Sequence, residues 1–247
     1  MIIAANWKAY VESTTKAKAL FTSAKKLSIK TDVEIILAPP APLLGLLVTD
    51  NKSSVTFASQ DISDTTGGAA TGETTAALLS GMGVKYVIVG HSERRAMGET
   101  DAIVASKVGH ALAQGLTPIV CIGERERDAE AHYLQGLRAQ IAATYEPLST
   151  QERMQVVIAY EPIWAIGKDA SEAITPHDLQ EMVLYIRKVL GDYLPGRASE
   201  ATKILYGGSV EPGNARELAG GSDINGFLVG HSSVDVATFT ALVKAIA

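Results

Sequence analysis

The sequence predicts an α/β fold, a closed (β/α)8 barrel that occupies residues 1–247 as a single domain. The chain has 247 residues, close to the roughly 250 that are typical of such a barrel. Eight short apolar runs recur along it, and most are continuous rather than alternating, as expected of parallel strands covered on both faces. Helical patterns separate these runs, and no linker or change in composition divides the chain.

The apolar runs predict eight strands. They lie at residues 2–5, 33–38, 55–58, 86–89, 118–122, 156–160, 203–206 and 226–229. Strands that alternate with helices can also form an open doubly wound sheet, but that fold usually has a glycine-rich segment after its first strand. Here that place holds Asn6, Trp7 and Lys8, which favours the closed barrel.

Helical patterns fill the intervals between the predicted strands. The clearest covers residues 175–190, where apolar side chains recur at steps of three and four and form one stripe. It begins with Thr175 and Pro176, a capping hydroxyl followed by proline at the first helical position. The other predicted helices span residues 14–27, 42–48, 74–82, 101–114, 129–144, 212–219 and 234–246.

Composition narrows the classes of function. A formal net charge of −5 argues against nucleic-acid binding, which favours a basic face. Cys121 is the only cysteine, so no intrachain disulfide can form, which suits a reducing cytoplasm. The N-terminal residues lack the pattern of a secretory signal, and no run of about 18 apolar residues predicts a membrane span. We therefore expect a cytoplasmic protein that binds neither nucleic acid nor membrane.

Polar and glycine residues follow the predicted strands at their carboxyl ends, where barrels of this kind carry their active sites. One site at that rim is therefore predicted. The residues that leave the strands there include Asn6, Lys8, Gln60, Asp61, His91, Ser92, Glu93, Arg94, Arg95, Glu124, Arg125, Glu161, Gly207, Gly208, Ser209, Gly230, His231, Ser232 and Ser233. No two histidines have metal-ligand spacing, and neither a P-loop nor a dinucleotide fingerprint occurs, so we expect no metal and no cofactor.

Four segments resemble the signature segments of the triosephosphate isomerase family. They read NWK at residues 6–8, VGHSERR at 89–95, AYEPIWAIG at 159–167 and YGGSV at 206–210. They stand in the family's order and at its spacing, and the resemblance covers essentially the whole chain. It implies a TIM barrel and an aldose–ketose isomerase of glycolysis and gluconeogenesis. The enzyme would interconvert dihydroxyacetone phosphate and D-glyceraldehyde 3-phosphate through an enediol(ate) intermediate, without a metal or cofactor.

The resemblance implies a catalytic role for five residues. Glu161 would be the general base, although a lone glutamate at a strand end is more often a solvated carboxylate. His91 would be the electrophile, a neutral imidazole at a helix N-terminus, for which this family is the standard example. Lys8 would supply a fixed positive charge, and Asn6 would orient it or donate to a substrate oxygen. Glu93 resembles the family's buried carboxylate that partners the lysine or relays protons; the alternative is an ordinary neighbour of the helix N-cap.

The resemblance also implies a phosphate-binding site, a mobile lid and a subunit contact. Glycine turns after strands seven and eight let backbone N–H groups approach phosphate oxygens. The implied phosphate-binding residues are Gly167, Ser209, Gly230 and His231. The implied lid residues are Pro162, Ile163, Trp164, Ala165, Ile166, Gly167 and Lys168. The implied contact with the partner subunit of a homodimer is made by Thr71, Gly72 and Glu73.

The chain departs from the family pattern at three places. The lid matches only through Gly167 and continues with Lys168, Asp169 and Ala170, so its far hinge is altered. His231 replaces the second of two glycines, which would strain the backbone if its φ were positive or would add a donor for the phosphate. Ala70 stands where the family commonly has an aromatic residue, so we expect a homodimer weaker than is usual.

Two other functions stay open at this point. A sister isomerase acting on a four-carbon ketose phosphate is kept open by His231 and the altered lid. A barrel that binds sugar phosphates without catalysis would need a degraded site, and the joint presence of Lys8, His91 and Glu161 argues against it.

Overall fold

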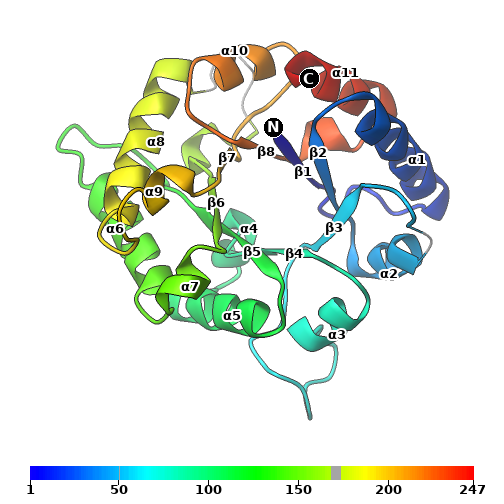
Figure 1. Ribbon diagram of the computed structural model, residues 1–247, viewed down its shortest axis with the longest axis horizontal. Helices are drawn as coiled ribbons and strands as arrows, with labels where there is room; N and C mark the ends of the chain where they lie inside the picture. The colour runs from blue at the N-terminus through cyan, green and yellow to red at the C-terminus, as the bar shows by residue number, and fades with distance from the viewer. Residues whose placement is uncertain (50, 168–173) are drawn as a thin grey trace.

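The structure, a computed structural model, describes residues 1–49, 51–167 and 174–247. It shows the predicted barrel: eight parallel strands follow one another in chain order, and the last pairs with the first to close the sheet (Figure 1). The strands are β1 (Ile2–Asn6), β2 (Glu34–Ala38), β3 (Thr56–Ser59), β4 (Tyr86–Val89), β5 (Thr117–Ile122), β6 (Val157–Tyr160), β7 (Ile204–Tyr206) and β8 (Gly226–Val229). Each strand end lies within one residue of its prediction.

The strands read as continuous apolar runs because each one is buried on both faces. In β1, Ile2 and Ala4 belong to an inner cluster formed by strand residues alone, whereas Ile3 and Ala5 belong to the layer between the strands and the helices. Successive strand residues point to opposite faces, so this alternation fills the barrel interior and the outer layer at once. Cys121 of β5 lies in the inner cluster, as expected of a packing residue.

A ring of helices surrounds the barrel (Figure 1). Those predicted are α1 (Thr14–Lys30), α2 (Ala41–Thr49), α3 (Ala76–Gly81), α5 (Asp101–Ala113), α6 (Tyr133–Tyr145), α8 (Pro176–Leu190), α10 (Ala215–Gly220) and α11 (Val236–Ile246). The described residues also form the short helices α4 (Ser92–Ala96), α7 (Thr150–Arg153) and α9 (Ala198–Ala201), and the 3-10 turns η1 (Ile163–Ala165) and η3 (His231–Ser233). Of these, only the helix N-terminus at His91, which begins α4, was expected from the sequence. None of the described helices is long and apolar enough to cross a membrane.

Capping side chains decide where several helices begin. Thr175 accepts a hydrogen bond from the Asp178 backbone at 3.1 Å, and Pro176 is the first residue of α8, as predicted. The predicted start of α6 at residue 129 is wrong, because the carboxylate of Asp128 binds the backbone N–H groups of His132 and Tyr133. This cap places the start of the helix at Tyr133.

The connection between β3 and α3 extends away from the barrel, as Figure 1 shows. Thr71, Gly72 and Glu73 lie on this connection, and all three are exposed. The residues predicted to contact a partner subunit therefore lie on a connection that projects from the barrel.

Candidate active site

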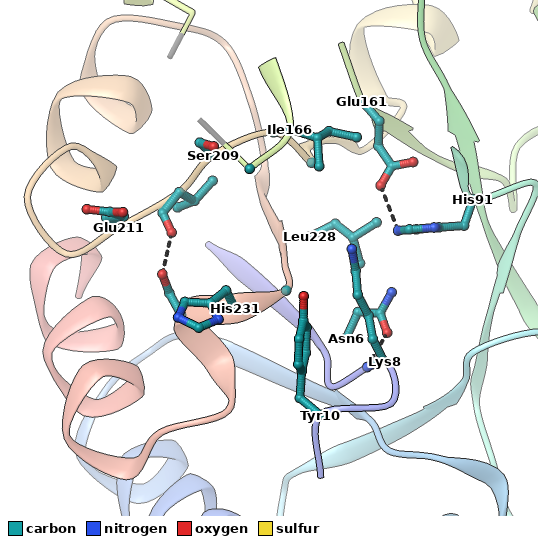
Figure 2. A pocket seen from close by; sticks show the side chains of 16 residues that line it. Asn6, Lys8, Tyr10, His91, Glu161, Ile166, Ser209, Glu211, Leu228 and His231 are labelled. Atoms are coloured by element: carbon teal, nitrogen blue, oxygen red, sulfur yellow. Dashed lines mark hydrogen bonds and ion pairs between the residues drawn. The ribbon is translucent and has the colours of Figure 1, made fainter. Parts of the chain in front are cut away.

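A cavity of about 480 Å³ opens at the carboxyl ends of the strands, where the sequence predicted the site. Figure 2 shows its side chains converging from the loops that follow β1, β4, β6, β7 and β8. The lining residues are Asn6, Lys8, Tyr10, His91, Glu161, Ile166, Gly167, Gly207, Gly208, Ser209, Val210, Glu211, Leu228, Gly230, His231 and Ser232. The cavity thus brings together nine of the residues singled out from the sequence as catalytic, phosphate-binding or lid residues: Asn6, Lys8, His91, Glu161, Ile166, Gly167, Ser209, Gly230 and His231.

Glu161 and His91 face each other across one end of this cavity (Figure 2). Oε1 of Glu161 lies 3.2 Å from Nε2 of His91, and the two side chains are only 3% and 6% exposed. The backbone N–H of Ser92 donates to Oε2 of Glu161 at 3.3 Å. Both carboxylate oxygens are therefore held in place, and the carboxylate is almost fully shielded from water.

His91 is the N-cap of α4, which agrees with the expected helix N-terminus. Its Nδ1 accepts a hydrogen bond from the backbone N–H of Glu93 at 3.2 Å. A ring nitrogen that accepts carries no proton, so in this arrangement the imidazole is neutral and its proton is on Nε2. The donor nitrogen of His91 is therefore the one aimed into the cavity.

Lys8 is fixed from its backbone to its ammonium group. Its φ of +46° lies in the left-handed region. Two hydrogen bonds hold the backbone there: the N–H of Lys8 donates to Oδ1 of Asn6 at 3.0 Å, and Nε2 of Gln60 donates to the carbonyl of Lys8 at 2.9 Å. Nζ of Lys8 donates to Oε1 of Glu93 at 2.6 Å. Glu93 does not line the cavity but reaches it through Lys8.

Glu93 differs from the buried carboxylate that the resemblance implied. Its side chain is 59% exposed in this chain. The reason is its place in the first turn of α4, a helix of five residues with no buried side chain, which leaves one side of the carboxylate open. Glu93 therefore partners Lys8 from the surface.

Two glycines allow the backbone around Glu161 to pack closely. A Cβ on Gly123, at the end of β5, would lie 1.7 Å from the carbonyl oxygen of Glu161. A Cβ on Gly207, after β7, would lie 2.6 Å from Cγ of Glu161. From the sequence, Gly207 was expected in the glycine turn of the phosphate site, and no role was expected for Gly123. Both residues instead shape the space that the proposed base occupies.

The first part of the predicted lid is anchored to the end of β5. Trp164, in η1, donates from Nε1 to Oε1 of Glu124 at 2.9 Å. The same oxygen accepts from the hydroxyl of Tyr160 and from Nε of Arg127, each at 2.9 Å. Glu124 is buried, and its role was missed because three donors converge on it only after folding. Lys168, Asp169 and Ala170, which carry the altered hinge, lie outside the described residues.

The opposite end of the cavity is formed by the loops after β7 and β8. Ser209 donates from Oγ to the carbonyl of Ala165 at 3.0 Å, which ties the β7 loop to the lid segment. Gly230 and His231 follow β8. The backbone of His231 does not lie in the positive-φ region, so the strain considered from the sequence does not arise. Tyr10 and Glu211 also line this end, and sequence reasoning singled out neither.

Comparison with known proteins agrees with this geometry. The family model described as triosephosphate isomerase matches residues 1–246. A triosephosphate isomerase of Moorella thermoacetica is 40% identical over 246 residues, which cover 98% of this chain and 97% of the relative. Relatives of the same name from Rhodopirellula baltica and Alkalilimnicola ehrlichii are 38% identical over 248 residues and 43% identical over 219 residues. These cover 99% and 86% of this chain, and 97% and 86% of the relatives. The chain belongs to the triosephosphate isomerase family.

Proposed function

We propose that the chain interconverts dihydroxyacetone phosphate and D-glyceraldehyde 3-phosphate, an aldose–ketose isomerisation in glycolysis and gluconeogenesis. The observation that carries the proposal is the contact at 3.2 Å between Glu161 and Nε2 of His91 in a cavity that Lys8 also lines. The names of the relatives support the three-carbon reaction and favour neither a four-carbon substrate nor a barrel without catalysis.

Glu161 acts as the base. It takes a proton from C1 of dihydroxyacetone phosphate, the electrons of that C–H bond form the C1–C2 double bond, and the carbonyl oxygen becomes an enediolate oxygen. Nε2–H of His91 gives a proton to the C2 oxygen and Nε2 takes the hydroxyl proton from the C1 oxygen, and the protonated carboxyl group returns a proton to C2; the C1 oxygen becomes the aldehyde oxygen and the C2 oxygen a hydroxyl. One side chain serves both transfers because the two carbons are neighbours.

His91 and Lys8 stabilise the charge that develops on the substrate oxygens. Nε2–H of His91 donates to the oxygens on C1 and C2, and a neutral imidazole can do this in either direction of the reaction. The ammonium of Lys8 attracts both the phosphate and the enediolate. Asn6 and Glu93 fix the two ends of Lys8, through its backbone N–H and through Nζ.

The loops opposite Glu161 bind the phosphate and exclude water. Backbone N–H groups at Gly167, Ser209, Gly230 and His231 approach the phosphate oxygens, since glycine turns allow close contact. The lid, from Pro162 to Lys168, closes over the enediolate and shields it from water, in which it would eliminate phosphate.

Replacing Glu161 by aspartate tests the base. Glu161→Asp withdraws the carboxylate by one methylene from the carbon it must reach, and we expect kcat to fall by about 100-fold or more with little change in KM. The measurement is steady-state isomerisation of D-glyceraldehyde 3-phosphate in the presence of a metal chelator. Glu126→Asp, at an exposed glutamate, is the matched control. An unchanged kcat in Glu161→Asp would remove Glu161 from the role of base.

The proposal includes a homodimer in the cytoplasm. Thr71, Gly72 and Glu73 project from the barrel, and Met97, at the end of α4, is 77% exposed. The lone, buried thiol of Cys121 supports a reducing compartment.

The strength of the dimer can be measured by sedimentation at micromolar concentration. The small side chain of Ala70 weakens the contact by about 2–3 kcal/mol relative to a buried aromatic residue. We expect a dimer that dissociates on dilution and that Ala70→Tyr tightens. A natural chain that is monomeric at micromolar concentration would contradict the dimer.

A further inference from the structure

Two aromatic side chains meet at the end of the cavity that lies opposite Glu161 and His91. Tyr10, from the loop after β1, and His231, in η3 after β8, are in edge-to-face contact, with ring centroids 5.9 Å apart and planes at 82°. The contact is possible because β8 pairs with β1 when the barrel closes. Figure 2 shows Tyr10 beside Lys8, with its hydroxyl directed the same way as the lysine side chain, and His231 beyond it.

The backbone accepts a side chain at His231 without strain. Positive φ among the described non-glycine residues occurs only at Lys8 and Ala131. His231 lines the cavity and is exposed, so it is available to a ligand there. The ring contact with Tyr10 restricts its orientation, and this lowers the entropy that the imidazole loses when it binds.

The charges at this end favour an additional hydrogen-bond donor. Lys8 and Glu211 are the charged side chains from the neighbouring loops that line it, and Glu93 already engages the ammonium of Lys8. The carboxylate of Glu211 repels an anion. Asp235, at the start of α11, is occupied by the backbone N–H and the hydroxyl of Thr238, each at 2.9 Å.

We infer that His231 donates a side-chain hydrogen bond to the phosphate of the substrate and that Tyr10 positions its imidazole. The ligand class is a phosphate monoester dianion, and inorganic phosphate is its simplest probe. His231 is the binding residue, and Tyr10 acts through it as a positioning residue. The inference rests on the proposed function, because it assumes that the phosphate occupies this end of the cavity.

His231→Phe tests the donor, because phenylalanine keeps a ring against Tyr10 and removes both nitrogens. Hydrogen bonds to charged groups are strong enough that we expect about a tenfold rise in the inhibition constant of inorganic phosphate and in KM for D-glyceraldehyde 3-phosphate. The kcat/KM for unphosphorylated D-glyceraldehyde should stay unchanged. His132→Phe, at an exposed histidine outside the cavity, is the matched control.

Two variants of Tyr10 test the positioning role. Tyr10→Phe keeps the ring and removes the hydroxyl, so inhibition by phosphate should match that of the natural chain. Tyr10→Ala removes the ring, so phosphate inhibition should weaken, while the same substitution made in His231→Phe should weaken it no further. A loss in Tyr10→Ala that is equally large in the His231→Phe background would overturn the positioning role.

The result that overturns the donor is an inhibition constant for phosphate that is the same in His231→Phe as in the natural chain. An equal loss with D-glyceraldehyde would also overturn it, because it would make the effect structural. Calorimetric titration with inorganic phosphate separates this inference from the proposed function, because it needs no turnover. If phosphate binding depends on His231 but the natural chain does not isomerise D-glyceraldehyde 3-phosphate, the proposed function fails, while the hydrogen bond from His231 to a phosphate group is retained.

Discussion

Glu161, His91 and Lys8 could be found from the sequence because each one leaves a predicted strand at its carboxyl end within a recognisable segment. Gly123 and Tyr10 could not. The reason for a glycine at 123 is the carbonyl oxygen of Glu161, which directly follows the next strand and comes close only when the barrel forms. The position of Tyr10 depends on its ring contact with His231, a residue 221 positions away in the chain. Contacts of this kind leave no local pattern.

Cys121 gives a prediction at the scale of one residue. Burial, and after it the charge of the neighbouring Glu161, raises the pKa of the Cys121 thiol well above its usual range. The thiolate is the reactive form of cysteine, so a folded chain should resist modification by a thiol-specific disulfide reagent at pH 8. We expect no labelled thiol per chain before unfolding and one in concentrated urea. Native labelling at the rate of a free thiol would contradict the buried position.

Among the described elements, the helices of six or more residues were predictable, and the three shorter ones were not. The stripe and cap of α8 are both local, so its start was predicted within one residue. The helices α4, α7 and α9 have four or five residues and bury no side chain, so they have no apolar periodicity to detect. α7 begins instead with a reciprocal capping box between Ser149 and Glu152.

The anchor of η1 to the end of β5 gives a prediction for an element. Glu124→Gln keeps an acceptor for Trp164 but removes the charge that balances Arg127, which is largely buried with a 26% exposed side chain. We expect the free energy of unfolding to fall by about 2–3 kcal/mol, which corresponds to about 5–10 °C in Tm. Thermal unfolding followed by circular dichroism measures this. Glu126→Gln is the control and should change the free energy by less than about 0.5 kcal/mol; an equal change in both variants would refute the anchor.

For the whole molecule, the closed barrel was predictable because its strands are buried on both faces, and this is visible as continuous apolar runs. The ionic cluster of Asp61, Arg94, Glu99 and Lys107 was not predictable as a whole. Lys107, with only 4% of its side chain exposed, donates to Asp61 at 2.7 Å and to Glu99 at 2.5 Å, and Arg94 contacts the same two carboxylates. These four residues lie on three segments that the fold brings together, so spacing in the sequence does not reveal them.

This cluster and the surface carboxylates predict how stability depends on pH. Burial acts to raise the pKa of Glu99, but hydrogen bonds from Lys107 and Arg94 outweigh it and the pKa is lowered. Bonds to backbone and side-chain donors likewise lower the pKa of Asp128, Glu152 and Asp235. A carboxylate with a lowered pKa stabilises the fold above its unfolded pKa, about 4, and this contribution is lost as the pH falls.

Asp61 has the opposite effect on the pH dependence of stability, because burial raises its pKa in spite of the contact with Lys107. Its protonation therefore favours the fold as the pH falls, but the carboxylates with a lowered pKa outnumber it, and their effect dominates. We expect the urea midpoint to decrease between pH 5 and pH 3, and to decrease less steeply in Glu99→Gln. A midpoint that stays constant over this range, or an identical slope in the variant, would contradict the assignment.

The left-handed backbone of Lys8 has a consequence for how this protein can be improved. A residue with a Cβ loses about 1–2 kcal/mol in that conformation, and glycine would not. A chain with glycine at this position would therefore resist heat better while losing its ammonium group. Engineering for thermal tolerance alone would select that change. At this one backbone position, a gain in resistance to unfolding therefore comes with a loss of affinity for an anionic sugar.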